Sequence, residues 1–205
     1  MKDSSGPNWY ALKVFYNKVF EIESFMRSRG IESYIPVQKE EVKGEKYLTL
    51  RRLQKRDGHF PDTRYVEDGA MIKIRKPLVT SLMFFHATKE DLLQIKADSE
   101  FQGRAMIYSS ADRSRPAVIP DREMAAFRLV ADSGETGLTF FSSDNITRYR
   151  QGDRVRVKCG PLKGAEGYIK RIKKDRRLLV SIEGIVAVAT SFIPPEDLEV
   201  IEDVS

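Results

Sequence analysis

The first forty residues combine strand-like and helix-like hydrophobic patterns. Residues 9–16 are mostly aromatic, aliphatic or β-branched, which predicts a strand buried on both faces. The next apolar residues recur at helical spacing and predict an amphipathic helix: Val19, Ile22, Phe25 and Met26. We expect Asn17 to be its N-cap and Gly30 to end it in a left-handed conformation. A further strand over 31–37 completes a β-α-β order, which opens an α/β or α+β domain.

A polar stretch divides the middle of the chain. Residues 38–69 hold few large apolar side chains and predict an exposed hairpin or a long loop. Strands are expected at 71–76 and 82–86, the second apolar enough to be central in a sheet. Thr88 followed by Asp91 resembles a capping box, ahead of a helix whose buried face is formed by Leu92, Leu93 and Ile95.

Shorter elements follow up to residue 147. We expect brief strands at 105–108 and 117–119, then a helix that opens at Pro120-Asp121 and buries Met124, Phe127 and Val130. Residues 131–147 are rich in Gly, Ser, Thr and Asp and show no period, which predicts a linker.

The last part of the chain has the alternation of β-structure. Five short apolar-polar segments are separated by Gly, Asp or Pro, at residues 154–158, 168–172, 178–182, 185–192 and 198–201. So many short strands in so few residues predict a small, strongly bent β-barrel of SH3-like size. Phe140 and Phe141 lie in the linker before it, and we expect them to dock onto a neighbouring domain.

Charge is distributed unevenly along a chain of 205 residues whose net charge is +5. Residues 148–177 include twelve basic and three acidic residues, a net charge of +9. Residues 178–205 include six acidic residues and no lysine or arginine. This polarity suits an anionic partner on one side of a small domain. Basic strands paired with their own acidic neighbours would explain it equally well.

The cysteine count and the apolar stretches of the sequence exclude several classes of protein. One cysteine, Cys159, cannot form an intramolecular disulfide or a Cys-rich metal site. The N-terminus lacks the apolar core of a signal peptide, and no stretch approaches the roughly 18 apolar residues of a membrane span. We therefore expect a cytoplasmic protein without a membrane partner.

Candidate catalytic residues are few. His59 lies in the polar stretch and His86 closes an apolar strand, and neither has metal-ligand spacing around it. Basic neighbours could lower the pKa of Cys159, but its place at a strand end beside Gly160 favours an idle thiol. Nucleotide-binding and nucleophile-elbow motifs are lacking. We expect a binding module, with no enzyme activity, cofactor or metal.

Residues 152–169 resemble a KOW motif. They contain Gly160-Pro161, the later glycines Gly164 and Gly167, and hydrophobic residues between them. Glycines at these positions let a short loop turn tightly between two strands of a narrow barrel. Ribosomal proteins carry KOW motifs too, so this motif alone leaves the class of protein open.

The rest of the chain resembles the N-terminal domain of the NusG family of transcription elongation factors. The matching features, in order, are Trp9-Tyr10, a helix, Tyr34-Ile35-Pro36, a polar insertion, Lys76-Pro77-Leu78 before an apolar strand, and Ile119-Pro120-Asp121 before a helix. The resemblance implies an α+β N-terminal domain over 8–131, with an antiparallel sheet flanked by helices and an insertion at 38–70. A linker over 132–147 and a KOW domain over 148–201, an SH3-like all-β barrel, would follow.

The resemblance implies binding to the clamp helices of RNA polymerase and suppression of pausing. The contacting residues would be Trp9, Leu78, Val79, Leu82 and Phe84. This chain has Pro77-Leu78-Val79-Thr80-Ser81-Leu82 where the family commonly has Pro-Leu-Phe-Pro-Gly-Tyr, so aliphatic residues replace two aromatic ones. The divergent insertion is more similar to a specialised paralogue than to the general factor, and such paralogues often serve polysaccharide or secretion gene clusters.

The same resemblance implies a second partner for the KOW domain, either ribosomal protein S10 or the termination factor Rho. The matching positions are Leu162, Lys163, Glu183 and Ile185, with Glu183 where bacterial relatives usually have an aromatic residue. A basic cluster in the insertion could reach non-template DNA, upstream duplex or nascent RNA: Arg51, Arg52, Lys55 and Arg56. Solvated loop charge is the alternative explanation of that cluster.

Two function classes follow. The first is a transcription elongation and antitermination regulator, expected to be a monomer, that binds polymerase and recruits a second factor. The alternative is a KOW-containing RNA-binding or ribosome-associated protein that contacts RNA through the basic segment 148–177.

Overall fold

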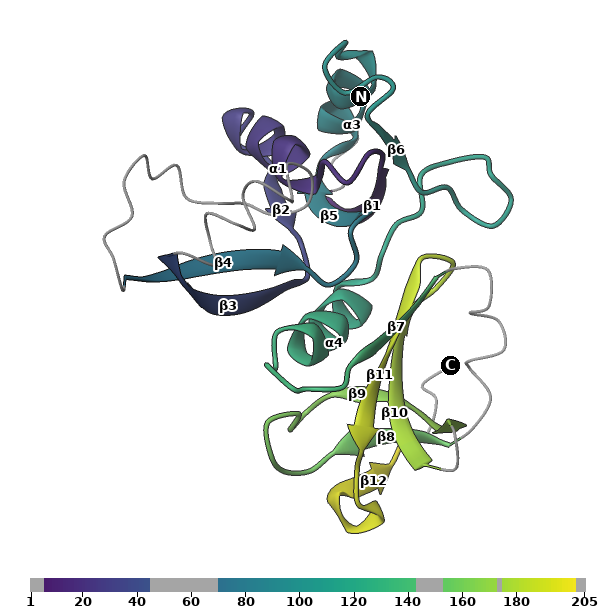
Figure 1. The fold of residues 1–205 in the computed structure, drawn as a ribbon. Helices are drawn as coiled ribbons and strands as arrows, with labels where there is room; N and C mark the ends of the chain where they lie inside the picture. Colours follow the sequence, from purple (N-terminus) through teal and green to yellow (C-terminus); the bar gives the residue numbers. More distant parts are fainter. Residues whose placement is uncertain (1–5, 45–69, 143–152, 173–174, 202–205) are drawn as a thin grey trace. The chain divides into compact units, whose positions relative to one another are not determined.

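The computed structural model describes residues 6–44, 70–142, 153–172 and 175–201 (Figure 1). The chain forms two compact units, one from Met1–Pro7 and Ala11–Ile107, the other from Asn8–Tyr10 and Tyr108–Ser205. The domain limits expected from the sequence, 8–131 and 148–201, stay a prediction. The described part of the chain contains no helix of the length and apolarity needed to cross a membrane.

The first unit is built on a four-stranded sheet. Its strand order is β2 (Glu32–Tyr34), β5 (Leu82–Ala87), β1 (Asn8–Val14) and β6 (Ala105–Ile107). The β2–β5 and β1–β6 pairs are antiparallel. Helices α1 (Val19–Ser28) and α3 (Lys89–Ala97) supply apolar side chains to the core, which agrees with the predicted α+β class.

Helix α1 ends as predicted but begins differently. Gly30 has a φ of 70° and donates to Arg27, while the amide of Ile31 donates to the Met26 carbonyl, as in a Schellman cap. The N-cap is Lys18, without a side-chain cap bond, so the predicted cap at Asn17 is wrong. Asn17 has a φ of 55°, and a left-handed residue lacks the extended backbone that an N-cap requires.

Helix α3 begins with the predicted capping box. Thr88 Oγ1 accepts from the Asp91 amide at 3.1 Å, and the Asp91 carboxylate accepts from the Thr88 amide at 2.8 Å. Leu92 and Ile95 are buried, but Leu93 is 70% exposed, so its predicted burial is wrong. Leu92 and Ile95 are three positions apart and lie on one face of the helix, whereas Leu93, the residue next to Leu92, points to another side.

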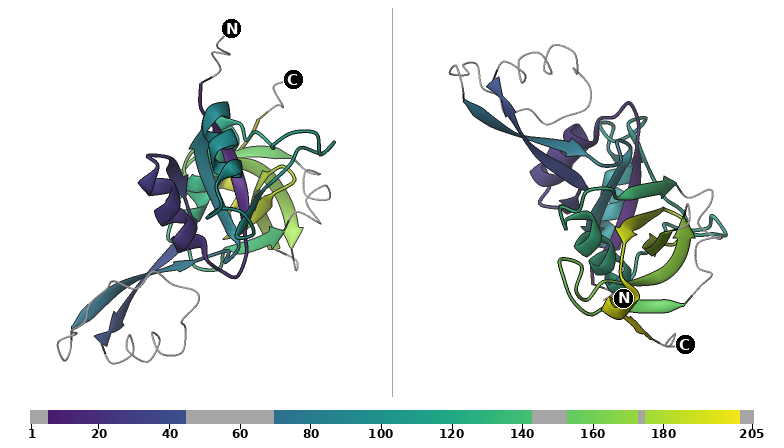
Figure 2. Two further views of the ribbon diagram at one scale, coloured as in Figure 1. Left: turned by 90° about the horizontal axis from the view of Figure 1, so that it is seen from above. Right: turned by 60° about the horizontal axis from the view of Figure 1, so that its bottom comes forward.

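Strands β3 (Val37–Lys43) and β4 (Met71–Pro77) form a separate two-stranded antiparallel ribbon. The predicted strand over 31–37 is therefore split, because Pro36 separates β2 from β3. Arg75 of the ribbon donates to both carboxylate oxygens of Glu23 in α1, at 2.9 and 2.8 Å. Figure 2 shows the ribbon extending beyond that helix. Most of the segment 38–69, predicted as an exposed hairpin or long loop, lies outside the described residues.

The second unit contains a six-stranded antiparallel sheet. It consists of β12 (Leu198–Val200), β8 (Arg154–Val157), β9 (Glu166–Ile172), β10 (Asp175–Ile182), β11 (Val186–Phe192) and β7 (Thr139–Ser142), in that order. A 3-10 turn (Pro195–Asp197) precedes β12. Strands β8 to β12 are the five predicted from the sequence, and with β7 they form an all-β antiparallel region consistent with the expected KOW domain.

Three predictions for residues 108–142 need correction. Residues 117–119 form no regular strand, only an isolated bridge between Ile119 and Trp9. The segment 131–147 was expected to lack strands, yet β7 lies within it and pairs with β11. Phe140 and Phe141 pack within the second unit rather than onto a neighbouring domain: the Phe140 ring is 6.3 Å from that of Phe127, edge to face.

Helix α4 (Asp121–Ala131) packs against β10 and β11 and is thus part of the second unit. Its predicted inward residues Met124, Phe127 and Val130 are all buried. Phe141 and Ile172 pack against a small cluster formed by Leu179, Ala187 and Ala189. The segment from α4 to β7 therefore contributes to the same hydrophobic core as the barrel strands.

The glycines of the KOW motif serve distinct roles. Gly164 has a φ of 88°, which closes the loop between β8 and β9. Gly167 lies against β10 so closely that a Cβ atom would be 2.3 Å from the Leu179 carbonyl oxygen. Only glycine fits there. The sequence predicted a tight loop at this glycine, whereas it lies within β9 and allows the close approach of β10.

Candidate functional site

The connection between β4 and β5 carries the polymerase-binding residues expected from the sequence. The Leu78 amide donates to the Pro36 carbonyl at 2.8 Å, and the Ser81 carbonyl accepts from the Val14 amide at 2.8 Å. These bonds fix both ends of a short backbone turn, and the Leu82 amide closes it on the Val79 carbonyl at 3.3 Å. Leu78 and Val79 are half-buried, so part of each aliphatic side chain faces solvent.

The other three expected contacts are core residues. Leu82 is 3% exposed and Phe84 is fully buried, with its ring 6.1 Å from that of Tyr34. Trp9 is 8% exposed and lies in the second unit, where the Arg128 guanidinium is 5.7 Å from its ring. Leu78 and Val79 therefore offer the accessible apolar surface of this set.

The expected partner-binding residues of the barrel lie on two different turns. Leu162 and Lys163 belong to the β8–β9 loop, whose shape is fixed by bonds from the Gly164 amide to Val157 and from the Ala165 amide to Leu162, both at 2.9 Å. Leu162 is 6% exposed, whereas Lys163 faces solvent. The loop therefore presents a charged side chain above a buried aliphatic one.

The second turn connects β10 and β11. The Ile185 amide donates to the Ile182 carbonyl at 3.1 Å, and Gly184 has a φ of 70°. Ile185 is 3% exposed, and Glu183 is exposed. The Glu183 amide also donates to the carboxylate of Glu123 in α4 at 3.4 Å.

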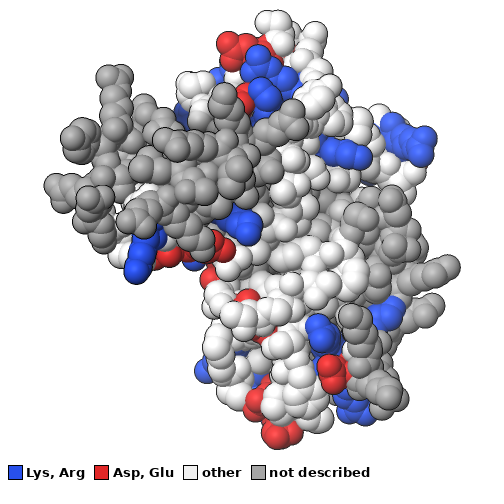
Figure 3. Space-filling view, in the orientation of Figure 1, with Lys and Arg blue, Asp and Glu red and all other residues white. Residues whose placement is uncertain are grey.

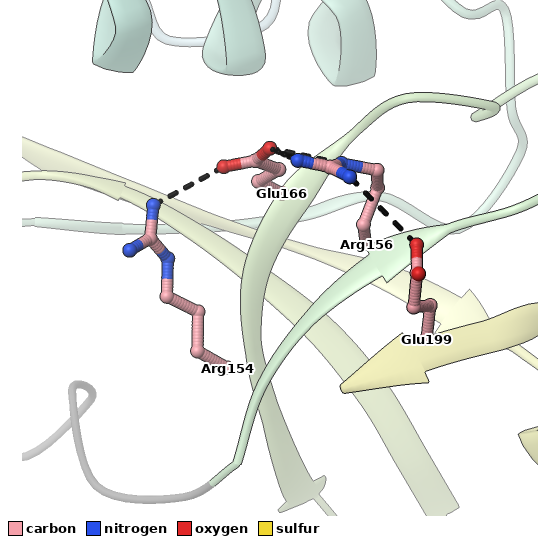
Figure 4. Close-up of polar contacts among 4 residues, drawn as sticks. All are labelled: Arg154, Arg156, Glu166 and Glu199. Carbon is pink, nitrogen blue, oxygen red and sulfur yellow. Dashed lines mark hydrogen bonds and ion pairs between the residues drawn. The ribbon is translucent and has the colours of Figure 1, made fainter. Parts of the chain in front are cut away.

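A network of ion pairs crosses β8, β9 and β12 (Figure 4). Glu166 accepts from Arg156 Nε and Nη2 at 3.0 and 2.7 Å and from Arg154 Nη2 at 3.1 Å. Arg156 also lies 3.7 Å from Glu199. The hydrogen bonds from Arg156 lower the pKa of Glu166, and the same bonds raise the pKa of Arg156.

This network determines how much positive charge of the basic segment 148–177 is left to attract an anionic partner. Arg154, Arg156 and Arg177 each lie within 3.6 Å of an acidic partner, Glu166 or Asp175. Figure 3 shows basic and acidic side chains beside one another on the drawn face of the barrel. Pairing of basic strands with their own acidic neighbours therefore accounts for part of the charge excess.

Residues outside the described ranges include the basic cluster Arg51, Arg52, Lys55 and Arg56, and also His59. The structure therefore places none of the expected nucleic-acid contacts. His86 is half-buried, and its Nδ1 lies 3.6 Å from the Glu32 carboxylate. Within the described ranges, acidic, His and Cys side chains form no group of three or more that could hold a metal ion.

Cys159 has a thiol whose pKa is raised above its ordinary value. Its thiol donates to Asp197 Oδ1 at 2.9 Å, and this bond raises the pKa of the thiol although Lys158 and Lys163 act in the opposite direction. The basic neighbours act in the direction considered from the sequence, but the bond with Asp197 outweighs them. A raised pKa reduces the thiolate fraction, which agrees with an idle thiol.

The sequence model of one family matches residues 7–128, more than half of the chain, and is described as transcription termination factor NusG. The chain belongs to the NusG family. Proteins of this family are transcription factors without enzymatic activity, so the expectation of a non-enzymatic regulator is confirmed. The family match includes the β4–β5 connection and helix α4 as far as Arg128.

One solved structure similar to this chain is described as "Domain interaction in Thermotoga maritima NusG". The two chains are 17% identical, the similarity covers 96% of this chain and 98% of the other, and the TM-score is 0.40. No curated protein matches this chain.

Two features of this NusG-family chain were missed by sequence reasoning. One is the docking of α4 and β7 on the barrel, and the other is the position of Glu166 between two arginines. The sequence does contain a signal for the position of Glu166, because Arg156 and Glu166 are cross-strand partners when β8 and β9 are paired as a hairpin. The first depends on long-range packing that no local pattern indicates.

Proposed function

We propose that this NusG-family protein binds RNA polymerase through its N-terminal α+β domain. The observation that carries the proposal is the family match over residues 7–128. The surface would centre on Leu78 and Val79, whose half-buried side chains can be covered by a partner helix at little structural cost. Leu82 and Phe84, buried in the same unit, would hold the shape of that surface.

The C-terminal barrel recruits a second factor in this proposal. Lys163 and Glu183 are exposed and available for contact, while Leu162 and Ile185 shape the turns that present them. Ribosomal protein S10 and Rho are the candidate partners. Because Glu183 carries a charge, a partner that buries it must supply a hydrogen-bond donor or a cation.

In this proposal the protein acts by staying bound to the polymerase and catalyses no reaction. A protein bound to the clamp holds the polymerase in a processive state, which reduces pausing and early termination, in this case across a particular operon such as a polysaccharide gene cluster. The insertion residues Arg51, Arg52, Lys55 and Arg56 would add a phosphate contact to non-template DNA or nascent RNA. Such a monomeric factor acts in the cytoplasm, where polymerase is found.

Binding of the purified chain to core RNA polymerase and to ribosomal subunits tests this function. We expect a complex with polymerase that persists at moderate salt, because apolar contacts around Leu78 and Val79 are not screened by ions. Binding to ribosomal subunits or RNA alone, with an affinity that falls steeply as salt is added, would overturn it in favour of an RNA-binding protein. Paired arginines such as Arg154 and Arg156 make that second outcome the less expected one.

A further inference from the structure

A groove of about 410 Å³ lies on the second unit, between the segment that follows α4 and the barrel. Its apolar lining includes Val157, Leu162 and Ile193, which are 3%, 6% and 7% exposed. Phe192 also lines the groove and is 54% exposed, so a large aromatic side chain stands there with half its surface in solvent. Exposed aromatic side chains beside an apolar hollow are typical of protein interfaces.

The charged side chains that line the groove are all acidic. Glu135 and Asp197 contribute carboxylates, and the lining contains no lysine or arginine. Glu135 Oε1 accepts from the Ser191 amide at 2.8 Å and from the Ser191 hydroxyl, whereas its Oε2 is buried without a hydrogen-bond partner among the described residues. Asp197 accepts from Cys159. Neither carboxylate forms an ion pair with a lysine or arginine of the described ranges.

Glu135 is half-buried, but its Oε2 atom is buried, and a buried oxygen left without a hydrogen bond carries a desolvation cost. A cation brought to the groove by a ligand would offset that cost, and the low local dielectric strengthens the attraction. An apolar side chain on the same ligand would fill the hollow and cover Phe192. The groove therefore matches a ligand that carries both groups at short separation.

We propose that this groove, between Glu135 and Asp197, binds a partner-protein segment in which an aromatic or aliphatic anchor lies next to an arginine or lysine. The proposal rests on the proposed function, in which the barrel recruits a second factor, and it names the chemistry of that factor. Of the partner-binding residues expected from the sequence, only Leu162 lines the groove; Lys163, Glu183 and Ile185 do not. The groove thus extends the recruiting surface to the segment that leaves α4.

Cys159 lines the groove and is the chain's only cysteine, so disulfide capture can report what the groove prefers. Four short glycine-serine peptides, each with one cysteine supplied as its mixed disulfide with 2-mercaptoethanol, are allowed to exchange with the intact protein. The Cys159 thiolate attacks the peptide sulfur and 2-mercaptoethanol leaves as a thiol, and excess free 2-mercaptoethanol keeps the exchange at equilibrium. The peptides contain Phe with Arg, Phe with Glu, Gly with Arg, or Gly with Glu. The fraction of protein joined to each peptide is measured by intact mass, relative to capture of cysteamine, which corrects for the reactivity of the thiol.

We expect the Phe–Arg peptide to be captured about tenfold more than the Phe–Glu and Gly–Arg peptides. Glu135→Gln should reduce the preference for Arg over Glu and leave the preference for Phe over Gly, because glutamine still accepts from Ser191. Addition of urea to unfold the protein should abolish both preferences.

Equal capture of the four peptides would overturn the proposal. So would a preference for the Glu peptides, which would mean that the nearby Lys158 and Lys163 dominate the field at the groove. Since the assay contains no polymerase, its failure is separate from failure of the proposed function. Conversely, this protein could capture the Phe–Arg peptide and yet fail to bind polymerase. The groove would then stand as a binding site, and the proposed role in transcription would be wrong.

Discussion

Glu166 accepts two hydrogen bonds from Arg156, at 3.0 and 2.7 Å, across the β8–β9 pair. This contact ties the first two barrel strands together and lowers the pKa of Glu166. We expect Glu166→Gln to lower the free energy of unfolding by less than about 1 kcal/mol at neutral pH, since the pair is partly exposed. Urea denaturation at pH 7 measures this difference.

The same pair gives a pH dependence with a defined sign. A carboxyl group whose pKa is lower in the folded state contributes its full stability above the unfolded value, about 4.3, and loses it as pH falls through the lower folded value. The stability gap between the natural chain and Glu166→Gln should therefore close below about pH 4. A gap that stayed constant down to pH 3 would contradict the assigned shift.

Phe140 joins the segment after α4 to the helix itself through its edge-to-face contact with Phe127. Because Phe140 is half-buried, we expect Phe140→Ala to cost about 1 to 3 kcal/mol of stability. Hydrogen exchange should also accelerate at residues 186–189, which pair with β7. Phe192→Ala, at a more exposed phenylalanine, is the matched control, and equal effects of the two variants would show that β7 is not held by this contact.

Gly167 leaves no space for a side chain. We expect Gly167→Ala to destabilise the barrel by about 2 kcal/mol or more, because the added Cβ would meet the Leu179 carbonyl oxygen and the backbone must move. Gly6→Ala, where no atom lies within 4 Å of the new Cβ, serves as the control. Thermal unfolding compares the two, and a Gly167→Ala variant as stable as the control would refute the close approach of β9 and β10.

Cys159 reacts through its thiolate, whose fraction depends on Asp197. Asp197→Ala removes both the hydrogen bond and the charge that raise the thiol pKa, so alkylation by iodoacetamide should become faster at pH 8 and its pH profile should shift to lower pH. Lys163→Gln is the opposite control, because Lys163 lowers the pKa, and its removal should slow the reaction. An unchanged profile for Asp197→Ala would show that Asp197 does not govern the thiol.

Local sequence signals predicted the elements of this fold well. The capping box at Thr88 and the left-handed Gly30 depend on atoms within a few residues of each other, and both are present. Likewise, the alternation in the last 55 residues identified all five strands of the barrel. Such features are local, so the order of residues alone specifies them.

Long-range packing was harder to predict. Strand β7 forms from a polar, glycine-rich stretch because β11 offers a free edge, and no pattern within residues 131–147 indicates that partner. The burial of Leu82 and Phe84 had the same cause: an apolar strand predicts a central position, but the sequence does not say which side chains remain accessible. Asn17 failed as a cap because the chain turns through two left-handed residues first.

The central claim is that the β4–β5 connection binds RNA polymerase, and a pair of leucine substitutions tests it most directly. Leu78 is half-buried in the expected surface, whereas Leu93 is an exposed leucine on α3 in the same unit. Both are changed to Asp, folding is checked by thermal unfolding, and affinity for core polymerase is measured. We expect Leu78→Asp to weaken binding at least about tenfold, the loss of one well-placed apolar contact, and Leu93→Asp to bind like the natural chain. Unchanged binding by a folded Leu78→Asp variant would contradict the account.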